Sequence, residues 1–273
     1  MVTFPNAKIN IGLNITSRRN DGYHNIETIM VPIPWCDILE ITRSNSNETT
    51  LSSHGRAVNC PIEKNLVMKA YRAMEKRYNL PAVNIILHKI IPDGAGLGGG
   101  SADAAFTLIT LNQLFEIGAS DDDLAQIAAT IGADCPFFIY NTPMLATGIG
   151  TDFSPISIDL SGYKILVVKP QVSVPTAQAY SGVTPSIPQT SLSQLIATPI
   201  SQWQGLIKND FEDSIFPIHP IIKNIKEQII AMGAKYASMS GSGSAVYGIF
   251  ESDKLAEDTL PLFNQCDIFV GNL

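Results

Sequence analysis

The sequence has 273 residues, of which 45% are hydrophobic and 16% are charged, and its formal net charge is −7. A chain of this length buries enough surface to fold without disulfide or metal staples, and its low charged fraction excludes an intrinsically disordered protein. The acidic balance argues against a general nucleic-acid binder, which needs clustered Lys and Arg side chains to neutralise phosphates. Any anionic ligand must therefore be held by local geometry rather than by the overall field of the protein.

The cysteines lie far apart and form no C-x-x-C pair, so we expect neither a zinc site nor a disulfide framework. They are Cys36, Cys60, Cys135 and Cys266. Residues 1–8 lack the basic and apolar regions of a signal peptide, and no apolar run approaches the ~20 residues that cross a bilayer. We therefore expect a soluble, cytoplasmic protein with reduced thiols and no membrane partner.

Helical and strand patterns alternate along the first half of the chain, which favours an α/β or α+β fold. Asn65 has the side chain of an N-cap for a helix over residues 66–77, and residues 83–88 have the pattern of a strand. The small side chains of residues 102–108 predict a second helix. Ser120 and Asp123 form a capping-box pattern ahead of a third helix over residues 124–131, and Gly132 is placed to end it.

The second half of the chain contains a long polar segment and one clear helix. Residues 181–198 are rich in Ser, Thr and Pro and predict a surface loop. Residues 220–229 have helical spacing, with Pro220 in the first turn and Gly233 at the end. Because the composition also changes around residues 148–151, we expect two domains, covering residues 1–155 and 156–273.

The most informative segment is glycine-rich and covers residues 94–100. Ordering five glycines in seven residues costs much backbone entropy on folding. Their presence therefore indicates that the backbone there needs φ/ψ values open only to glycine, or must come close to another group. Backbone N–H groups that lead into a helix N-terminus form a nest for anions, and phosphate is the usual guest. No lysine follows the glycines, which excludes a Walker A loop. A G-x-G-x-x-G pattern is present, but the acids at the distance that a dinucleotide fold requires, Asp121–Asp123, begin a helix instead.

Residues outside the loop offer the remaining chemistry of phosphoryl transfer, which needs a proton acceptor and a cation. Asp134 lies in a tight turn before an aromatic run, where it fits either a general base or a turn cap. Lys8 lies on an alternating strand, where a lysine commonly faces solvent. Tyr23 and His24 follow an Asn-Asp-Gly turn. They fit either a hairpin tip that covers apolar surface or a pair that stacks on a pyrimidine and hydrogen-bonds its edge.

The stretch from Pro92 to Ala105, P-x-x-x-G-L-G-G-G-S-A-D-A-A, closely resembles the ATP-phosphate loop of the GHMP kinases, named for galactose, homoserine, mevalonate and phosphomevalonate. The resemblance implies that residues 96–101 wrap the β- and γ-phosphates of ATP while the dipole of the following helix faces them. Residues 239–246 resemble the family's third motif, a turn near the phosphates, and two further positions lie where the family builds its base pocket. The implied ATP-binding residues are Pro92, Asp93, Gly94, Ala95, Gly96, Leu97, Gly98, Gly99, Gly100, Ser101, Ala102, Asn65, Lys89, Ser240, Gly241, Ser242 and Gly243.

Within this family, the sequence resembles the kinases that act on diphosphocytidyl-methylerythritol. Lys8 and Asp134 match their catalytic lysine and aspartate in the patterns A-K-I-N and G-A-D-x-P-F-F. The match implies Asp134 as the base and Lys8 as a cation that orients it and steadies developing charge. Residues 19–24 resemble the R-x-D-G-Y-H signature that contacts the substrate cytosine. The implied substrate-binding residues are Asn10, Tyr23, His24, Thr176 and Tyr180. One departure lies at residues 147–151, where relatives often carry Arg before the first Gly and Glu after the second; Asp152 is the candidate substitute for that acid.

The resemblance implies an α+β fold with an N-terminal ATP-binding α/β domain, a C-terminal ferredoxin-like α+β domain and an active site in the cleft between them. The implied reaction is ATP-dependent phosphorylation of the 2-hydroxyl of a cytidine diphosphate ester, in non-mevalonate isoprenoid precursor biosynthesis. ATP is the co-substrate, Mg²⁺ is expected, and Ser101 is a candidate contact for it. The alternatives are another GHMP kinase acting on mevalonate, homoserine or a sugar, a non-catalytic nucleotide-binding regulator, and an NAD-binding oxidoreductase. Nothing in the sequence indicates an oligomeric state.

Overall fold

The computed structural model describes residues 1–58, 60–251 and 261–273. The chain forms two compact units, and neither is continuous in sequence. Unit 1 contains Met1–Ala7, Trp35–Asp93 and Gly98–Thr142, and unit 2 contains Lys8–Pro34, Gly94–Leu97 and Pro143–Leu273. The glycine-rich segment is therefore divided between the units after Leu97. The contiguous division of the domains at residue 155 stays a prediction.

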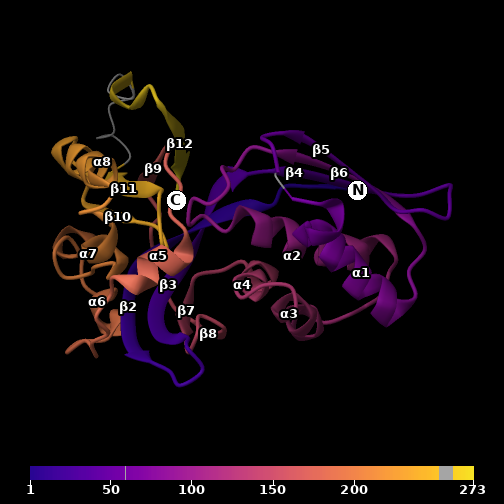
Figure 1. The fold of residues 1–273 in the computed structure, drawn as a ribbon, viewed down its shortest axis with the longest axis horizontal. Coiled ribbons are helices and arrows are strands. Elements are labelled where there is room, and N and C mark those ends of the chain that lie inside the picture. The colour runs from indigo at the N-terminus through magenta and orange to yellow at the C-terminus, as the bar shows by residue number, and fades with distance from the viewer. Residues whose placement is uncertain (59, 252–260) are drawn as a thin grey trace. The chain divides into compact units, whose positions relative to one another are not determined.

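Unit 1 is a four-stranded sheet with helices against it (Figure 1). The strand order is β1 (Val2–Thr3), β4 (Ile38–Arg43), β6 (Val83–Lys89) and β5 (Thr50–Gly55). β4 pairs antiparallel with β1 and β6, whereas β5 pairs parallel with β6. Helix α1 (Leu66–Tyr78) packs on α2 (Gly99–Leu114), and α2 also packs on β4. Two shorter helices, α3 (Asp121–Ala129) and α4 (Cys135–Tyr140), pack on each other and on α2, and a 3₁₀ turn, η1 (Ile62–Lys64), precedes α1.

The predicted start of α1 and the predicted strand β6 are both confirmed. Asn65 caps α1, because its side chain accepts a hydrogen bond of 2.9 Å from the Val67 N–H. Every second residue of β6 is buried, from Val83 to Lys89. Since strand side chains alternate between faces, this register brings Lys89 into the interior of unit 1 directly before the glycine-rich segment.

Two helix ends differ from the prediction. α2 begins at Gly99 instead of residue 102, because Gly98 takes the left-handed conformation (φ 72°) and serves as its N-cap. The last two glycines of the loop are therefore the first residues of the helix. The capping box of Ser120 and Asp123 is confirmed. However, α3 ends at Ala129, before Gly132, since the Thr130 hydroxyl and N–H both donate to the Ile127 carbonyl and close the last turn.

Unit 2 contains two four-stranded sheets. One has the order β2 (Asn6–Arg18), β3 (His24–Cys36), β7 (Met144–Thr147) and β8 (Asp152–Pro155), and the first two residues of β2 and the last two of β3 belong to unit 1. The other is antiparallel, with the order β10 (Tyr236–Met239), β11 (Val246–Glu251), β9 (Tyr163–Pro170) and β12 (Cys266–Asn272). Helix α8 (Pro220–Ala231) packs on this second sheet (Figure 1). Its buried isoleucines, Ile222, Ile225 and Ile229, join the unit's core.

The remaining elements of unit 2 are short: α5 (Thr176–Ser181), α6 (Leu192–Leu195), η2 (Ile200–Gln202) and α7 (Phe211–Ile215). The predicted surface loop over residues 181–198 is interrupted by α6, and most of its other residues are exposed or half-buried. Leu192 is buried there, and its N–H donates to Glu27. α8 starts at Pro220 as predicted, and Gly233 follows it with φ 96°. In the part of the chain that the structure describes, no helix is long and apolar enough to cross a bilayer.

Candidate active site

The glycine-rich segment and the third motif meet within unit 2. Gly96 has φ 75°, and a Cβ atom there would overlap the carbonyl oxygen of Ser240. The Ser240 hydroxyl donates to the Gly96 carbonyl at 2.8 Å, and the Ala245 N–H donates to the Ala95 carbonyl at 3.1 Å. Only glycine allows both this backbone conformation and this close approach. The structure therefore brings two segments of the predicted ATP site together, although they lie more than 140 residues apart.

Lys8 is buried, with 3% of its surface exposed, so the solvent-facing alternative is wrong. Its Nζ donates to the Asn10 side-chain oxygen and, at 3.1 Å, to the Gly96 carbonyl. Asn10 is also buried, and its amide donates to the Thr28 hydroxyl at 3.0 Å. Asn10, predicted to bind substrate, is thus engaged with Lys8 and Thr28.

A second set of predicted substrate residues lines one groove of unit 2, with a volume of about 720 Å³. We call it the aromatic pocket; its lining includes Arg18, Tyr23, His24, Ile149, Thr176 and Tyr180. The rings of His24 and Tyr180 stack with centroids 4.9 Å apart and planes at 18°, and Phe211 meets Tyr180 edge-on. Tyr23 remains 63% exposed. The groove thus offers an ordered ring pair beside an aromatic side chain with a free surface.

The turn before these rings explains part of the R-x-D-G-Y-H pattern. Arg19 and Asp21 form an ion pair at 2.9 Å, and Asp21 also accepts the Tyr23 N–H at 3.1 Å. The hydrogen bond from Arg19 is the main cause that lowers the pKa of the Asp21 carboxyl. Arg19 and Asp21 therefore fix the hairpin turn, and the turn presents Tyr23 and His24.

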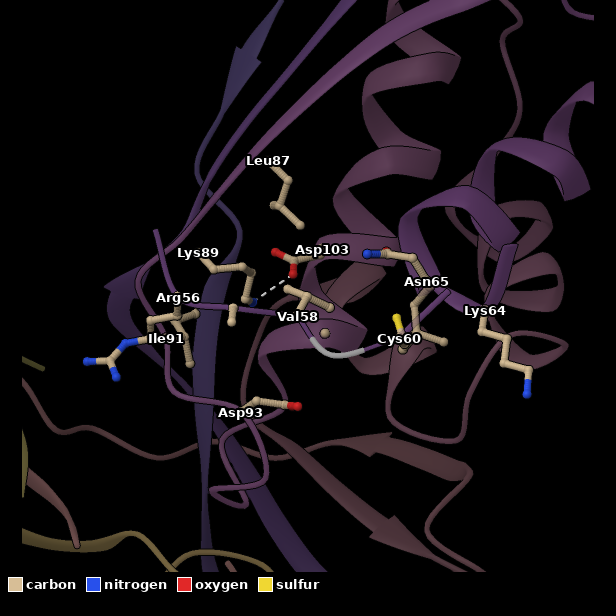
Figure 2. A pocket seen from close by; sticks show the side chains of 13 residues that line it. Arg56, Val58, Cys60, Lys64, Asn65, Leu87, Lys89, Ile91, Asp93 and Asp103 are labelled. Atoms are coloured by element: carbon tan, nitrogen blue, oxygen red, sulfur yellow. Dashed lines mark hydrogen bonds and ion pairs between the residues drawn. The ribbon is translucent and has the colours of Figure 1, made fainter. Parts of the chain in front are cut away.

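Unit 1 contains its own pocket, of about 180 Å³, beside the first turn of α2. We call it the base pocket, after the role predicted for Asn65 and Lys89; Figure 2 shows it, with apolar side chains of Val58, Leu87 and Ile91 among those around it. Four of the predicted ATP-binding residues line it: Asn65, Lys89, Asp93 and Gly100. Three more residues line the pocket, Arg56, Cys60 and Lys64. No motif in their segment predicted nucleotide binding.

A charged cluster lies at the inner end of the base pocket. The Lys89 ammonium binds Asp103 at 2.7 Å (Figure 2) and also Asp37. Asp37 additionally accepts the Ile91 N–H at 2.9 Å. The ammonium is therefore committed to carboxylates, and Lys89 lines the pocket without its charge being available. Sequence reasoning missed Asp37 and Asp103; the available signal was a lysine at an inward-facing strand position, which requires a buried partner.

The cluster contains two carboxylates and one ammonium, so it carries excess negative charge. Burial raises the pKa of the Asp103 carboxyl to about 7; Lys89 opposes this shift and the charge of Asp37 adds to it. Burial would lower the pKa of Lys89, but the two carboxylates outweigh it and raise that pKa. One oxygen of Asp103, Oδ1, is buried without a hydrogen-bond partner among the described residues. A buried carboxylate in this position favours binding a proton.

Asp134 lies in unit 1, whereas Lys8 lies in unit 2. Asp134 is half-buried at the N-cap position of α4, and its side chain makes no helix-capping hydrogen bond. The neighbouring Cys135 is fully buried, and burial raises the pKa of its thiol to about 11. A thiol with this pKa is protonated at neutral pH and is a poor nucleophile.

Comparison with known proteins gives consistent matches along the chain. Two family models match, "GHMP kinases N terminal domain" over residues 65–142 and "GHMP kinases C terminal" over residues 193–260. A protein from Parabacteroides distasonis named 4-diphosphocytidyl-2-C-methyl-D-erythritol kinase is 52% identical over 273 residues, covering 100% of both chains. One of the same name from Bacteroides fragilis is 50% identical over 256 residues, covering 93% of each chain.

Solved structures agree with these relatives. A crystal structure of 4-(cytidine 5'-diphospho)-2C-methyl-D-erythritol kinase matches with a TM-score of 0.83 at 30% identity, covering 99% of this chain and 98% of that chain. Homoserine kinase from Cytophaga hutchinsonii shares the fold, with a TM-score of 0.70 at 19% identity over 98% of this chain and 94% of that chain. The expected α+β GHMP kinase fold is confirmed. On its family models, its full-length relatives and its fold, the chain belongs to the GHMP kinase family and is a kinase.

Proposed function

We propose that the chain transfers the γ-phosphate of ATP to the 2-hydroxyl of 4-diphosphocytidyl-2-C-methyl-D-erythritol, a cytidine diphosphate ester of the non-mevalonate isoprenoid route. Relatives that share about half of its residues carry the name of that kinase. The observation that carries the proposal is the aromatic pocket of unit 2, in which exposed Tyr23 lies beside the stacked rings of His24 and Tyr180. Acceptors such as mevalonate or homoserine have no ring for which this pocket would be required. Because the reaction consumes ATP, we place it in the cytoplasm.

The aromatic pocket suits a pyrimidine for two reasons. Its volume of about 720 Å³ lies in the range of small-molecule sites. Stacking of a base on an aromatic side chain contributes roughly 1–3 kcal/mol, and Tyr23 has the exposed surface for it. The His24 ring nitrogens can donate to or accept from the edge of cytosine, and the Thr176 hydroxyl adds a second polar group at the same groove.

The nucleotide donor is assigned to the base pocket and the glycine-rich segment. Val58, Leu66 and Leu87 supply an apolar wall for adenine, and Asn65 supplies an amide at its rim. Residues 96–101 lead into the N-terminus of α2, where backbone N–H groups and the helix dipole favour phosphate. This arrangement offers donors to polyphosphate without formal positive charge, in a protein whose net charge is −7.

Mg²⁺ is expected with ATP, and the donor set fits an ion that arrives on the nucleotide. Among the described residues, no group of three or more His, Cys, Asp or Glu side chains could hold a metal by itself. Magnesium in kinases is held largely by phosphates and water, with one or two protein oxygens. We assign the hydroxyl of Ser101, in the first turn of α2, as the protein ligand of this Mg²⁺ ion. When bound, the ion neutralises charge on the phosphates.

We assign the proton transfer to Asp134 and the charge stabilisation to Lys8. The Asp134 carboxylate accepts the proton of the 2-hydroxyl as its oxygen attacks the γ-phosphorus, and the bond from phosphorus to the β,γ-bridging oxygen breaks. Lys8 Nζ, held by Asn10 and Gly96, offers a fixed positive charge toward the transferring group. Of these two side chains, Lys8 is the one whose holding hydrogen bonds are described here, from its Nζ to the Asn10 side chain and the Gly96 carbonyl.

A kinase assay that follows ADP release with a panel of acceptors tests the proposal. We expect turnover with the cytidyl substrate and little with mevalonate, homoserine or sugars. Equal or faster turnover of one of those acceptors would refute the substrate assignment. No ADP release with any acceptor would favour a non-catalytic regulator, and nicotinamide binding without ATP turnover would favour an oxidoreductase.

Variants of Tyr23 test the pocket itself. Tyr23→Ala should raise the KM for the acceptor roughly 5- to 150-fold, as expected for one lost stacking contact, and leave the KM for ATP unchanged. Tyr23→Phe keeps the ring and serves as the matched control. An unchanged acceptor KM in Tyr23→Ala would contradict stacking.

A further inference from the structure

Lys8 is held at the end of a chain of hydrogen bonds that lies within unit 2. Its Nζ donates to the Gly96 carbonyl at 3.1 Å and to the Asn10 side-chain oxygen. Both acceptors belong to residues that also bond to Ser240. The Ser240 hydroxyl donates to the Gly96 carbonyl at 2.8 Å and accepts the Asn10 N–H at 3.3 Å. Ser240 thus contacts the two residues that set the direction of the Lys8 ammonium.

Ser240 has no free hydrogen-bond donor for a nucleotide. It is fully buried, and its own N–H donates to the Ala245 carbonyl at 2.9 Å. With the hydroxyl bound to Gly96, both of its donors are used inside unit 2. Ser240 was predicted to bind ATP through the third motif, but its hydrogen bonds indicate a role that reaches the reaction through Lys8.

The same bonds also fix the peptide that joins Gly96 to Leu97. Its carbonyl oxygen accepts from both Lys8 and Ser240, so the peptide plane is held by two donors. Loss of the Ser240 hydroxyl would leave this carbonyl, one of the two acceptors that orient the Lys8 ammonium, without its second donor.

Asn209 clamps the turn that carries Ser240. Its amide nitrogen donates to the carbonyls of Met239 and Gly241, one on each side of Ser240, at 2.8 Å each. Its oxygen accepts the Phe211 N–H at 3.0 Å. Glu212 adds a second hold, because its carboxylate accepts the Met239 N–H at 2.9 Å. Asn209 is 1% exposed and fully committed to these bonds.

We propose that Ser240 and Asn209 are positioning residues for the phosphoryl transfer, acting by fixing Lys8 through its two acceptors, the Asn10 side chain and the Gly96 carbonyl. The proposal rests on the proposed function only in assigning charge stabilisation to Lys8, and it is independent of which acceptor is used. Misplacement of a catalytic group by about 1 Å can cost about 100-fold in rate. Ser240→Ala and Asn209→Ala should therefore each lower kcat about 10- to 100-fold, with both KM values changed less than about threefold.

A double-mutant cycle of Ser240→Ala and Lys8→Ala separates positioning of Lys8 from general structural damage. If Ser240 acts through Lys8, Ser240→Ala should cause less than a twofold further loss of kcat in the Lys8→Ala background. Ser214→Ala is the matched control: it also removes a buried hydroxyl of unit 2, one that donates to the Ala179 and Phe211 carbonyls, and it should leave kcat unchanged. The same fold-loss with and without Lys8, or a loss confined to the KM for ATP, would overturn the proposal.

A spectroscopic measurement keeps the proposal testable if the acceptor assignment fails. In protein labelled with ¹³C at lysine Cε, the Lys8 signal is identified by its disappearance in Lys8→Arg. Ser240→Ala and Asn209→Ala should shift or broaden this signal, whereas Ser214→Ala should not. An unchanged Lys8 signal in folded Ser240→Ala protein would overturn the proposal, while failure to phosphorylate the cytidyl substrate would overturn only the proposed function.

Discussion

Asp103→Asn removes the excess negative charge from the buried cluster of Asp37, Lys89 and Asp103 while keeping the size of the side chain. In the folded protein, burial raises the pKa of Asp103 from 3.8 to about 7. A carboxyl with a raised pKa stabilises the fold below its unfolded value, and this stability is lost as pH rises toward the folded value. Stability should therefore fall between about pH 4 and pH 7.

The size of this effect follows from the distance between the two pKa values. The interval from 3.8 to about 7 corresponds to on the order of 4 kcal/mol in the free energy of unfolding. Because Asp37 and Asp103 share one ammonium, this loss of stability is a property of the two coupled carboxylates and not of Asp103 alone. The Asp103→Asn protein lacks this titration. Its unfolding free energy relative to the parent should therefore rise by roughly 2–4 kcal/mol between pH 5 and pH 8.

Tryptophan fluorescence can follow unit 1 separately. The sequence has two tryptophans, Trp35 in unit 1 and Trp203 in unit 2, and both are buried. In a Trp203→Phe background, urea unfolding at pH 5, 6, 7 and 8 then reports on the surroundings of Trp35. Glu48→Gln, which neutralises an exposed carboxylate of the same unit, is the control and should follow the parent. Parallel pH profiles for Asp103→Asn and the parent would refute the reasoning.

Three further predictions concern the nucleotide, the residues to which we assign the phosphoryl transfer and the close approach at Gly96. Cys60 is exposed at the base pocket, so ATP at ten times its Kd should slow its alkylation by a maleimide about tenfold by mass action. Mass spectrometry measures this, buried Cys135 should stay unmodified, and equal Cys60 rates with and without ATP would contradict the base pocket. Lys8→Ala and Asp134→Asn should each lower kcat by about 10²–10⁴-fold, and the loss in the double variant should be smaller than the product of the two single losses. ADP-release kinetics in which the two losses multiply would argue against a shared role. Gly96→Ala should lower the thermal midpoint by several degrees more than Gly205→Ala, because both have positive φ but only Gly96 meets another atom, the Ser240 carbonyl; equal midpoints in calorimetry would show that this close approach is unimportant.

Local signals in the sequence predicted the local structure well. Asn65 and Ser120 are side chains that satisfy helix N-termini without help from the rest of the fold, so both helix starts could be predicted. The start of α2 could not, because Gly98 serves as N-cap through its left-handed backbone rather than through a side chain. α6 was missed because a single buried residue, Leu192, provides no periodicity.

Long-range pairings were beyond sequence reasoning for a physical reason. Lys8 lies on a strand whose alternation cannot show which face is buried, and its burial depends on Gly96 and Ser240, which are distant in sequence. Likewise, nothing near Asp37 indicates that it meets Lys89. The family resemblance supplied Lys8 and Asp134 without explaining what holds them. The structure supplies that explanation for Lys8, through Asn10, Ser240 and Asn209.

The interleaving of the two units has a consequence for how the chain is made. Strand β2 precedes the other strands of unit 2 in the chain, yet its Leu13 exchanges backbone hydrogen bonds with Lys208 and Asp210, and Tyr247 donates to the Asn10 carbonyl. Unit 2 therefore cannot close until most of the chain has been synthesised, whereas the strands and helices of unit 1 are complete by residue 142. Lys8, to which we assign charge stabilisation, is therefore translated long before Ser240, whose hydrogen bonds fix the acceptors of its ammonium.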